Sequence, residues 1–145
     1  MSSVNQEYLA EQFQMMEEYL RRARRVAALS RQDYLADSTA VDASVRQLTV
    51  LFETSHNIAK HLGSRFGWWT PSSKAETFEV LAEQGVLPAD LARTFREASR
   101  FRNLVTYQTA RVEEDLVYEI LQKHLTDFER FAASVARWLA ATGAD

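Results

Sequence analysis

The stretch Thr39–Leu62, TAVDASVRQLTVLFETSHNIAKHL, carries apolar or small residues at alternating steps of four and three. These positions are Val41, Val45, Leu48, Phe52, Ser55, Ala59 and Leu62. Residues at this spacing lie on one side of an α-helix and form a seam for packing against partner helices. Asp37 or Ser38 is placed to cap the start of this helix, and Gly63 is placed to end it. The stretch therefore predicts a long helix that belongs to a helical bundle.

Two further segments, one near each end of the chain, show the same helical spacing. The first covers about Asn5–Leu29, where apolar residues recur mostly three or four positions apart. The last covers about Val112–Leu139, and its apolar stripe is long enough for a helix of roughly 40 Å. We therefore expect three long helices in all.

Between residues 63 and 112 the sequence predicts two shorter helices. Ser73 and Glu76 form a capping-box pattern that opens a helix ending near Glu83. Gly85 is suited to end that helix, and Pro88 suits the first turn of the next one. The sum is an all-α, up-and-down bundle of about five helices.

Composition supports this interpretation. The chain has 145 residues, of which 46% are hydrophobic and 26% charged, a balance that suits one globular domain covering residues 1–145. Only four glycines and two prolines are present, too few for a fold made of strands and tight turns. The composition thus favours an all-α protein.

Charge and cysteine content narrow the range of functions. The formal net charge is -3, so any contact with nucleic acid must be local. The absence of cysteine excludes disulfides, zinc–thiolate sites and thiol nucleophiles. The start of the chain is polar, and no window of 18 residues is apolar enough to span a membrane. We therefore expect a cytoplasmic protein with no membrane contact.

The order of these features resembles the HepT-like branch of the HEPN superfamily. The segment Asn57–Leu62, NIAKHL, is similar to a motif of that family's second helix. The segment Ser73–Asn103, SKAETFEVLAEQGVLPADLARTFREASRFRN, resembles the family in its helix, glycine break, proline restart and terminal Arg-Asn pair. The resemblance covers nearly the whole chain. It implies a HEPN bundle that assembles as a homodimer.

The resemblance also implies a function and a site. Proteins of this family are usually metal-independent ribonucleases that act as toxins, and a nucleotidyltransferase antitoxin of the MNT type neutralises them. Their motif is Arg, four residues, His, one residue, Tyr, and in some systems the antitoxin attaches AMP to that tyrosine. In RFRNLVTYQTARV, residues 100–112, Arg102 and Asn103 match the start of the motif. Tyr107 stands in the histidine position, however, and Thr109 stands in the tyrosine position.

These residues leave the chemistry open. Cleavage of RNA without a metal or cofactor needs a base, an acid and donors that stabilise the phosphorane charge. Arg102 and Asn103 supply donors, but a tyrosine with a pKa near ~10 is a poorer base than a histidine with a pKa near ~6.5. The resemblance thus implies a toxin that cleaves RNA, such as tRNA or mRNA, or its weakened descendant. The alternatives are an inactive dimer that binds RNA or nucleotides and, less favoured, a helical scaffold.

Other residues are secondary candidates. Asn57 and His61 are four apart on one helical face and, with Thr109, are candidates for substrate binding. The alternative is a pair that faces solvent or a second copy. His56 and His124 show no pattern with each other and suggest neither a metal site nor a catalytic role.

Two clusters have a structural and a functional interpretation. The basic run at residues 21–25 suits the C-terminal end of the first helix and a face exposed to solvent. The alternative is that it contacts an RNA backbone. Trp68 and Trp69 suit packing at a loop or dimer seam, or else stacking on bases. Sequence alone favours packing and solvation for these clusters.

Overall fold

The computed structural model describes the main chain of residues 4–68, 74–107 and 113–143, and the side chains of residues 4–68, 76–98 and 113–143. The described residues form seven helices and no strand. They are α1 (Gln6–Ala27), α2 (Arg31–Leu35), α3 (Ser38–Phe66), α4 (Lys74–Glu83), α5 (Ala89–Tyr107), α6 (Glu114–Lys123) and α7 (Leu125–Thr142). The all-α prediction is confirmed. The number of helices exceeds five because α2 was not predicted and the last helix is divided.

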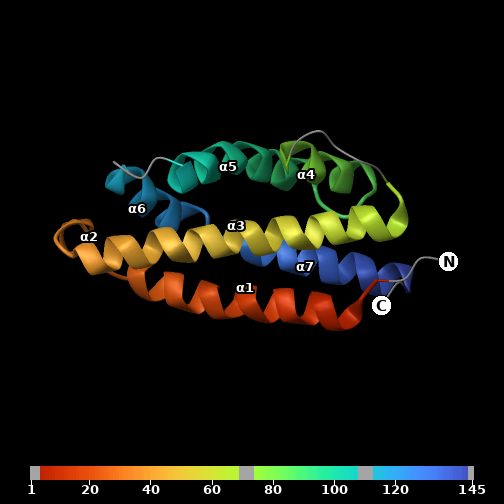
Figure 1. Cartoon of the computed structure of the whole chain (residues 1–145), viewed down its shortest axis with the longest axis horizontal. Helices are drawn as coiled ribbons and strands as arrows, with labels where there is room; N and C mark the ends of the chain where they lie inside the picture. The colour runs from red at the N-terminus through yellow and green to blue at the C-terminus, as the bar shows by residue number, and fades with distance from the viewer. Residues whose placement is uncertain (1–3, 69–73, 108–112, 144–145) are drawn as a thin grey trace.

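The helices pack around α3, which runs through the middle of the bundle (Figure 1). α1 lies along one side of α3, α4 and α5 lie along the opposite side, and α7 lies behind it. α5 runs antiparallel to α3, so its C-terminal end lies beside the N-terminal half of α3 and close to α6. This arrangement is the up-and-down bundle that the sequence predicts.

The start of α3 follows the prediction, but its end does not. The side chain of Asp37 accepts a hydrogen bond from the main-chain N–H of Ala40 and caps the helix. At the other end, the helix continues through the buried Gly63 and stops at Gly67, which has a φ of 66°. A glycine inside a helix costs only about 1 kcal/mol, and a stop requires the chain to turn into the left-handed region. The predicted end at Gly63 was therefore wrong by one turn.

The last predicted helix is divided at His124, which separates α6 from α7. His124 has a φ of -117° and a ψ of 0°, outside helical geometry. Its N–H still donates to the carbonyl of Ile120 at 2.8 Å, and its own carbonyl accepts from the N–H of Asp127 at 3.1 Å. No glycine or proline marks the break, and the apolar spacing continues across it. The sequence therefore predicted one helix where the structure has two.

Phenylalanine rings fix α5 on the bundle. The ring centroid of Phe95 in α5 lies 5.0 Å from Phe78 of α4, 5.5 Å from Phe128 and 5.1 Å from Phe131 of α7. Phe52 of α3 lies 5.2 Å from Phe128. All five rings are buried. Such ring pairs add to folding stability beyond the effect of their buried area. The first half of α5 is therefore held firmly by the core.

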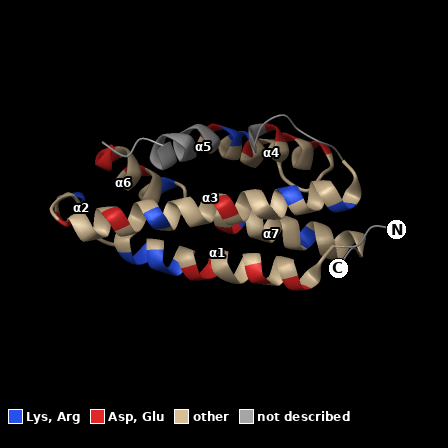
Figure 2. Ribbon diagram, viewed as in Figure 1, with Lys and Arg blue, Asp and Glu red and all other residues tan. Residues whose placement is uncertain are grey.

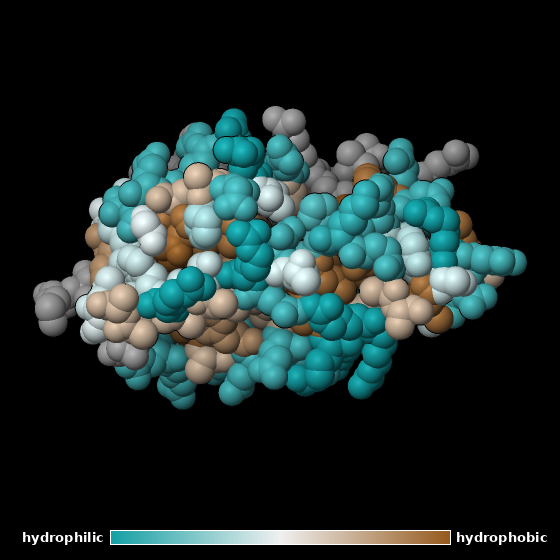
Figure 3. Space-filling view, turned by 180° about the vertical axis from the view of Figure 1, so that it is seen from behind, coloured by the Kyte–Doolittle hydropathy of each residue, from teal (hydrophilic) through white to brown (hydrophobic). Residues whose placement is uncertain are grey.

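The rear face of the molecule is mostly hydrophilic, and apolar surface shows there in separate patches (Figure 3). Within the described part of the chain, no helix combines the length and the hydropathy needed to cross a membrane.

Candidate functional site

The three residues predicted to be catalytic share one helix end. Arg102, Asn103 and Tyr107 belong to the final turns of α5 (Ala89–Tyr107). The main chain of α5 is described as far as Tyr107, whereas the side chains of these three residues lie outside the described ones. Thr109 lies outside the described residues altogether. The fold thus brings the start of the predicted motif to the end of the bundle where α5 approaches α6 (Figure 1).

The two residues predicted to bind substrate from α3 face α1 instead. The Nδ2 of Asn57 donates to the Oε1 of Gln12 at 3.2 Å. The Nε2 of His61 accepts the main-chain N–H of Asn5 at 3.0 Å, and its ring lies 5.0 Å from that of Tyr8. Both residues belong to the C-terminal half of α3, whereas α5 ends beside the N-terminal half. The structure therefore does not bring Asn57 and His61 together with the end of α5.

The environment of His61 favours its neutral form. Burial lowers the pKa of His61, and the nearby charge of Arg65 lowers it further. A neutral imidazole is also what the contact with Asn5 requires, because Nε2 accepts a hydrogen bond only when it carries no proton. His61 is thus a hydrogen-bond acceptor that ties the start of the chain to α3.

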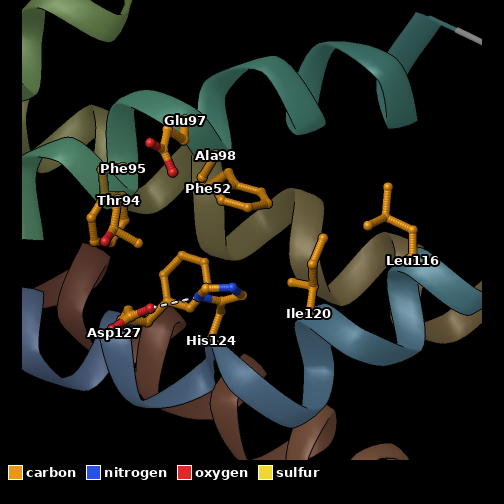
Figure 4. A pocket seen from close by; sticks show the side chains of 10 residues that line it. Phe52, Thr94, Phe95, Glu97, Ala98, Leu116, Ile120, His124 and Asp127 are labelled. Atoms are coloured by element: carbon orange, nitrogen blue, oxygen red, sulfur yellow. Dashed lines mark hydrogen bonds and ion pairs between the residues drawn. The ribbon is translucent and has the colours of Figure 1, made fainter.

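A pocket of about 270 Å³ lies between α3, α5, α6 and α7, within one turn of the predicted motif (Figure 4). Its apolar wall consists of Phe52, Phe95, Ala98, Leu116, Ile120 and Phe128. The sequence did not reveal it, because its walls come from four helices whose relative positions depend on the packing of the whole bundle.

Four polar or charged residues also line this pocket: Thr94, Glu97, His124 and Asp127. The Nδ1 of His124 lies 2.8 Å from the Oδ2 of Asp127, and both side chains extend toward α5 (Figure 4). The exposed fractions of these side chains are 46% for His124 and 18% for Asp127. A carboxylate on Nδ1 fixes the ring and leaves Nε2 for another partner.

An arginine continues this polar chain. The NH1 of Arg130 lies 3.7 Å from the Oδ1 of Asp127, and its NH2 donates to the Oδ2 of Asp90 at 3.1 Å. The hydrogen bond from Arg130 lowers the pKa of Asp90. Asp127 is therefore held from both sides, which orients His124. The sequence pattern indicated no role for His124, but a histidine three residues before an aspartate on a helix is a signal that points to this pair.

The basic run lies at the C-terminal end of α1, next to acidic positions of the same helix (Figure 2). Ion pairs join Arg21 and Arg22 to Glu18, and Arg24 to Glu129. All of these side chains are exposed, so each pair adds little to stability. The pairs support a solvated face rather than an RNA-binding strip on α1.

Of the two neighbouring tryptophans, Trp68 packs against other aromatic rings. Trp68 stacks on Phe66 with ring centroids 5.2 Å apart and meets the edge of Trp138 at 5.4 Å. Trp69 lies outside the described residues. Among the side chains that the structure describes, no three histidines or carboxylates gather in a way that could hold a metal ion.

Comparison with known proteins agrees with this fold. A family model described as ribonuclease HepT-like matches residues 16–135. The mRNA nuclease HepT of Shewanella oneidensis is 26% identical over 95 residues, which are 66% of this chain and 71% of that protein.

Solved structures show the same architecture. A tri-AMPylated HEPN toxin of Shewanella oneidensis, in complex with an MNT antitoxin, aligns with a TM-score of 0.84 and 21% identity, over 92% of this chain and 99% of that one. The cytosolic protein YutE of Bacillus subtilis, of unknown function, aligns with a TM-score of 0.86 and 14% identity, over 98% and 95% of the two chains. Identities this low establish the fold alone. The family model, by contrast, spans most of the sequence and includes the end of α5, and on this ground the chain belongs to the ribonuclease HepT-like family.

Proposed function

We propose that this chain is the toxin of a toxin–antitoxin pair and cleaves RNA in the cytoplasm without a metal ion. The observation that carries the proposal is Arg102–Asn103, the start of the family's motif, on the last turns of α5 within the matched range. The name of the relative, an mRNA nuclease, supports RNA as the substrate.

Each residue of the motif has a role that its chemistry allows. The guanidinium of Arg102 stabilises the charge that develops on the phosphorane, and the amide of Asn103 donates to a phosphate oxygen. The 2′-hydroxyl gives its proton to a water molecule as its oxygen attacks phosphorus, and the bond from phosphorus to the 5′-oxygen breaks. The phenol of Tyr107 suits protonation of that leaving oxygen better than removal of the 2′ proton, because a phenol is a weak base at neutral pH. Two copies in a homodimer would place two such helix ends in one cleft.

The proposed partner is a nucleotidyltransferase antitoxin of the MNT type. Support comes from the structural relative, which was solved with such an antitoxin and carries AMP groups. In this chain Thr109 occupies the position that resembles the family's modified tyrosine. The proposal therefore includes binding and neutralisation by the antitoxin but not AMP transfer to a tyrosine at this position.

Substrate contact by Asn57, His61 and Thr109 stays a prediction. Asn57 already bonds to Gln12 of α1, and His61 to Asn5 just before it, so contact with RNA would require these bonds to open. We therefore assign the centre of the site to the end of α5 alone.

The test compares cleavage of total RNA and tRNA by the purified chain and by its Arg102→Ala variant. Loss of one charge-stabilising donor should lower the cleavage rate by about 10²–10³-fold. Arg93→Ala, at an exposed arginine of the same helix, is the matched control and should keep the rate. Equal cleavage by the wild-type chain and Arg102→Ala would remove Arg102 from the mechanism.

A second candidate is an inactive dimer that binds RNA or nucleotides, and the observation that favours it is the pair of replacements at Tyr107 and Thr109. The wild-type chain decides between the two, because the second candidate requires RNA binding without cleavage, and Tyr107→His then tests whether the missing histidine is the cause. If the site has only lost its proton-transfer group, histidine should raise cleavage by about 10²-fold or more. If the wild-type chain binds RNA and neither form cleaves it, the second candidate holds.

A further inference from the structure

The pocket between α3, α5, α6 and α7 adjoins the proposed site. Ala98 of α5 lines the pocket, and Arg102 follows one turn later on the same helix. Positions four apart on a helix lie on the same side, about 6 Å apart along the axis. A ligand in the pocket and a phosphate at the end of α5 would thus be neighbours, as a base and a phosphate are in one RNA strand.

The size and walls of the pocket suit a flat ring system. A cavity of about 150 Å³ lined by leucine, isoleucine and phenylalanine holds benzene. This pocket offers about 270 Å³. The buried rings of Phe52, Phe95 and Phe128 form an apolar floor, and the half-buried Leu116 and Ile120 form the side on α6. The volume thus accommodates one or two fused rings.

The polar residues indicate which rings fit best. Glu97 contributes a carboxylate on the α5 side, and the Asp127 carboxylate holds His124 on the opposite side (Figure 4). Carboxylates repel a phosphate and accept hydrogen bonds from N–H groups. Adenine, cytosine and guanine carry exocyclic amino groups, whereas uracil presents only carbonyl acceptors and one ring N–H.

We propose that this pocket binds one nucleobase with an exocyclic amino group, packed against the apolar floor and bordered by Glu97 and His124. The strand then continues so that its phosphate lies at the end of α5. The inference rests on the proposed function, because it names a base subsite beside the same motif.

The test titrates the full chain with AMP, CMP, UMP and ribose 5-phosphate while NMR follows the imidazole signals of His124. A His124→Gln sample assigns these signals. AMP and CMP should shift them, UMP should bind about tenfold more weakly, and ribose 5-phosphate should leave them unchanged. Glu97→Gln should narrow the difference between CMP and UMP, and Glu11→Gln, on the exposed face of α1, should not.

A variant that fills the pocket gives a second readout. Ala98→Leu places three more carbon atoms in the pocket and should weaken AMP binding about tenfold. Ala10→Leu adds the same atoms at an exposed position of α1 and should leave binding unchanged. Thermal unfolding shows whether both variants are folded.

Several results would overturn the inference. Equal shifts with AMP and ribose 5-phosphate would indicate a phosphate site. Unchanged AMP binding in Ala98→Leu would place the base elsewhere. An altered oligomeric state in Ala98→Leu, with no nucleotide effect at His124, would mean that a second copy covers the pocket. The proposed function is judged separately: a chain that cleaves RNA through Arg102 yet shows no base-dependent shift keeps the function and loses the subsite.

Discussion

His61 shows how a residue from a family-like motif takes a structural contact. Its Nε2 accepts the N–H of Asn5, which is also the residue whose side chain caps the start of α1. One imidazole thus fixes the point at which the chain enters the bundle. Because burial lowers the pKa of His61, this contact is sensitive to pH.

We expect part of the folding stability to depend on His61 between about pH 8 and about pH 5. The unfolded chain has the ordinary histidine pKa of 6.5, and the folded chain has a lower one. As pH falls below 6.5, the unfolded state therefore binds more protons than the folded state does. The free energy of unfolding should be highest above pH 6.5 and should decrease as the pH is lowered from there.

The measurement is urea unfolding of the wild-type chain and His61→Gln across this range. Glutamine keeps an acceptor oxygen but does not titrate, so its free energy of unfolding should depend less on pH. Parallel curves for the two proteins would show that His61 does not titrate with folding.

At the scale of elements, α2 and α6 are held by tyrosine hydroxyls. The hydroxyl of the buried Tyr34 in α2 lies 2.8 Å from the Oγ of Ser44 in α3. The hydroxyl of Tyr118 in α6 donates to the carbonyl of Leu29, in the turn after α1, at 2.8 Å. A helix of five residues such as α2 has little stability of its own and depends on contacts of this kind.

Tyr34→Phe should lower the free energy of unfolding by about 1 kcal/mol. The loss is limited because the Ser44 hydroxyl still donates to the carbonyl of Val41 and is not left without a partner. Tyr118→Phe is the matched control and should lower the free energy of unfolding less. The Tyr118 hydroxyl is only partly buried, so water can replace it at the carbonyl of Leu29. Urea denaturation measures both values, and an equal or larger loss for Tyr118→Phe would contradict this ranking.

The helix boundaries show what local sequence can and cannot specify. The spacing of apolar residues predicted α1 and α3 closely, because that spacing is a direct consequence of 3.6 residues per turn. Gly63 and His124 misled for opposite reasons. Gly63 is a stop signal that packing overrode, and His124 is a break that no stop signal announced.

At the scale of the whole molecule, the proposed site needs a second copy. The predicted motif lies at one end of α5, and a shared cleft requires two such ends to meet. A homodimer should therefore sediment with about twice the 16.6 kDa mass of one chain. Analytical ultracentrifugation at several concentrations checks this, and a monomer at every concentration that cleaves RNA would refute the shared cleft.

The sequence by itself determined the helical class, the course of most helices and the family, and it predicted a motif at Arg102 with departures at Tyr107 and Thr109. These follow from residue identity and from contacts three or four positions apart along the chain. The tertiary structure alone decided that Asn57 and His61 face α1, that Arg24 of α1 meets Glu129 of α7, and that His124 and Asp127 line a pocket beside α5. The physical reason is that a helix specifies which residues share a face, whereas the packing of distant segments specifies what that face meets.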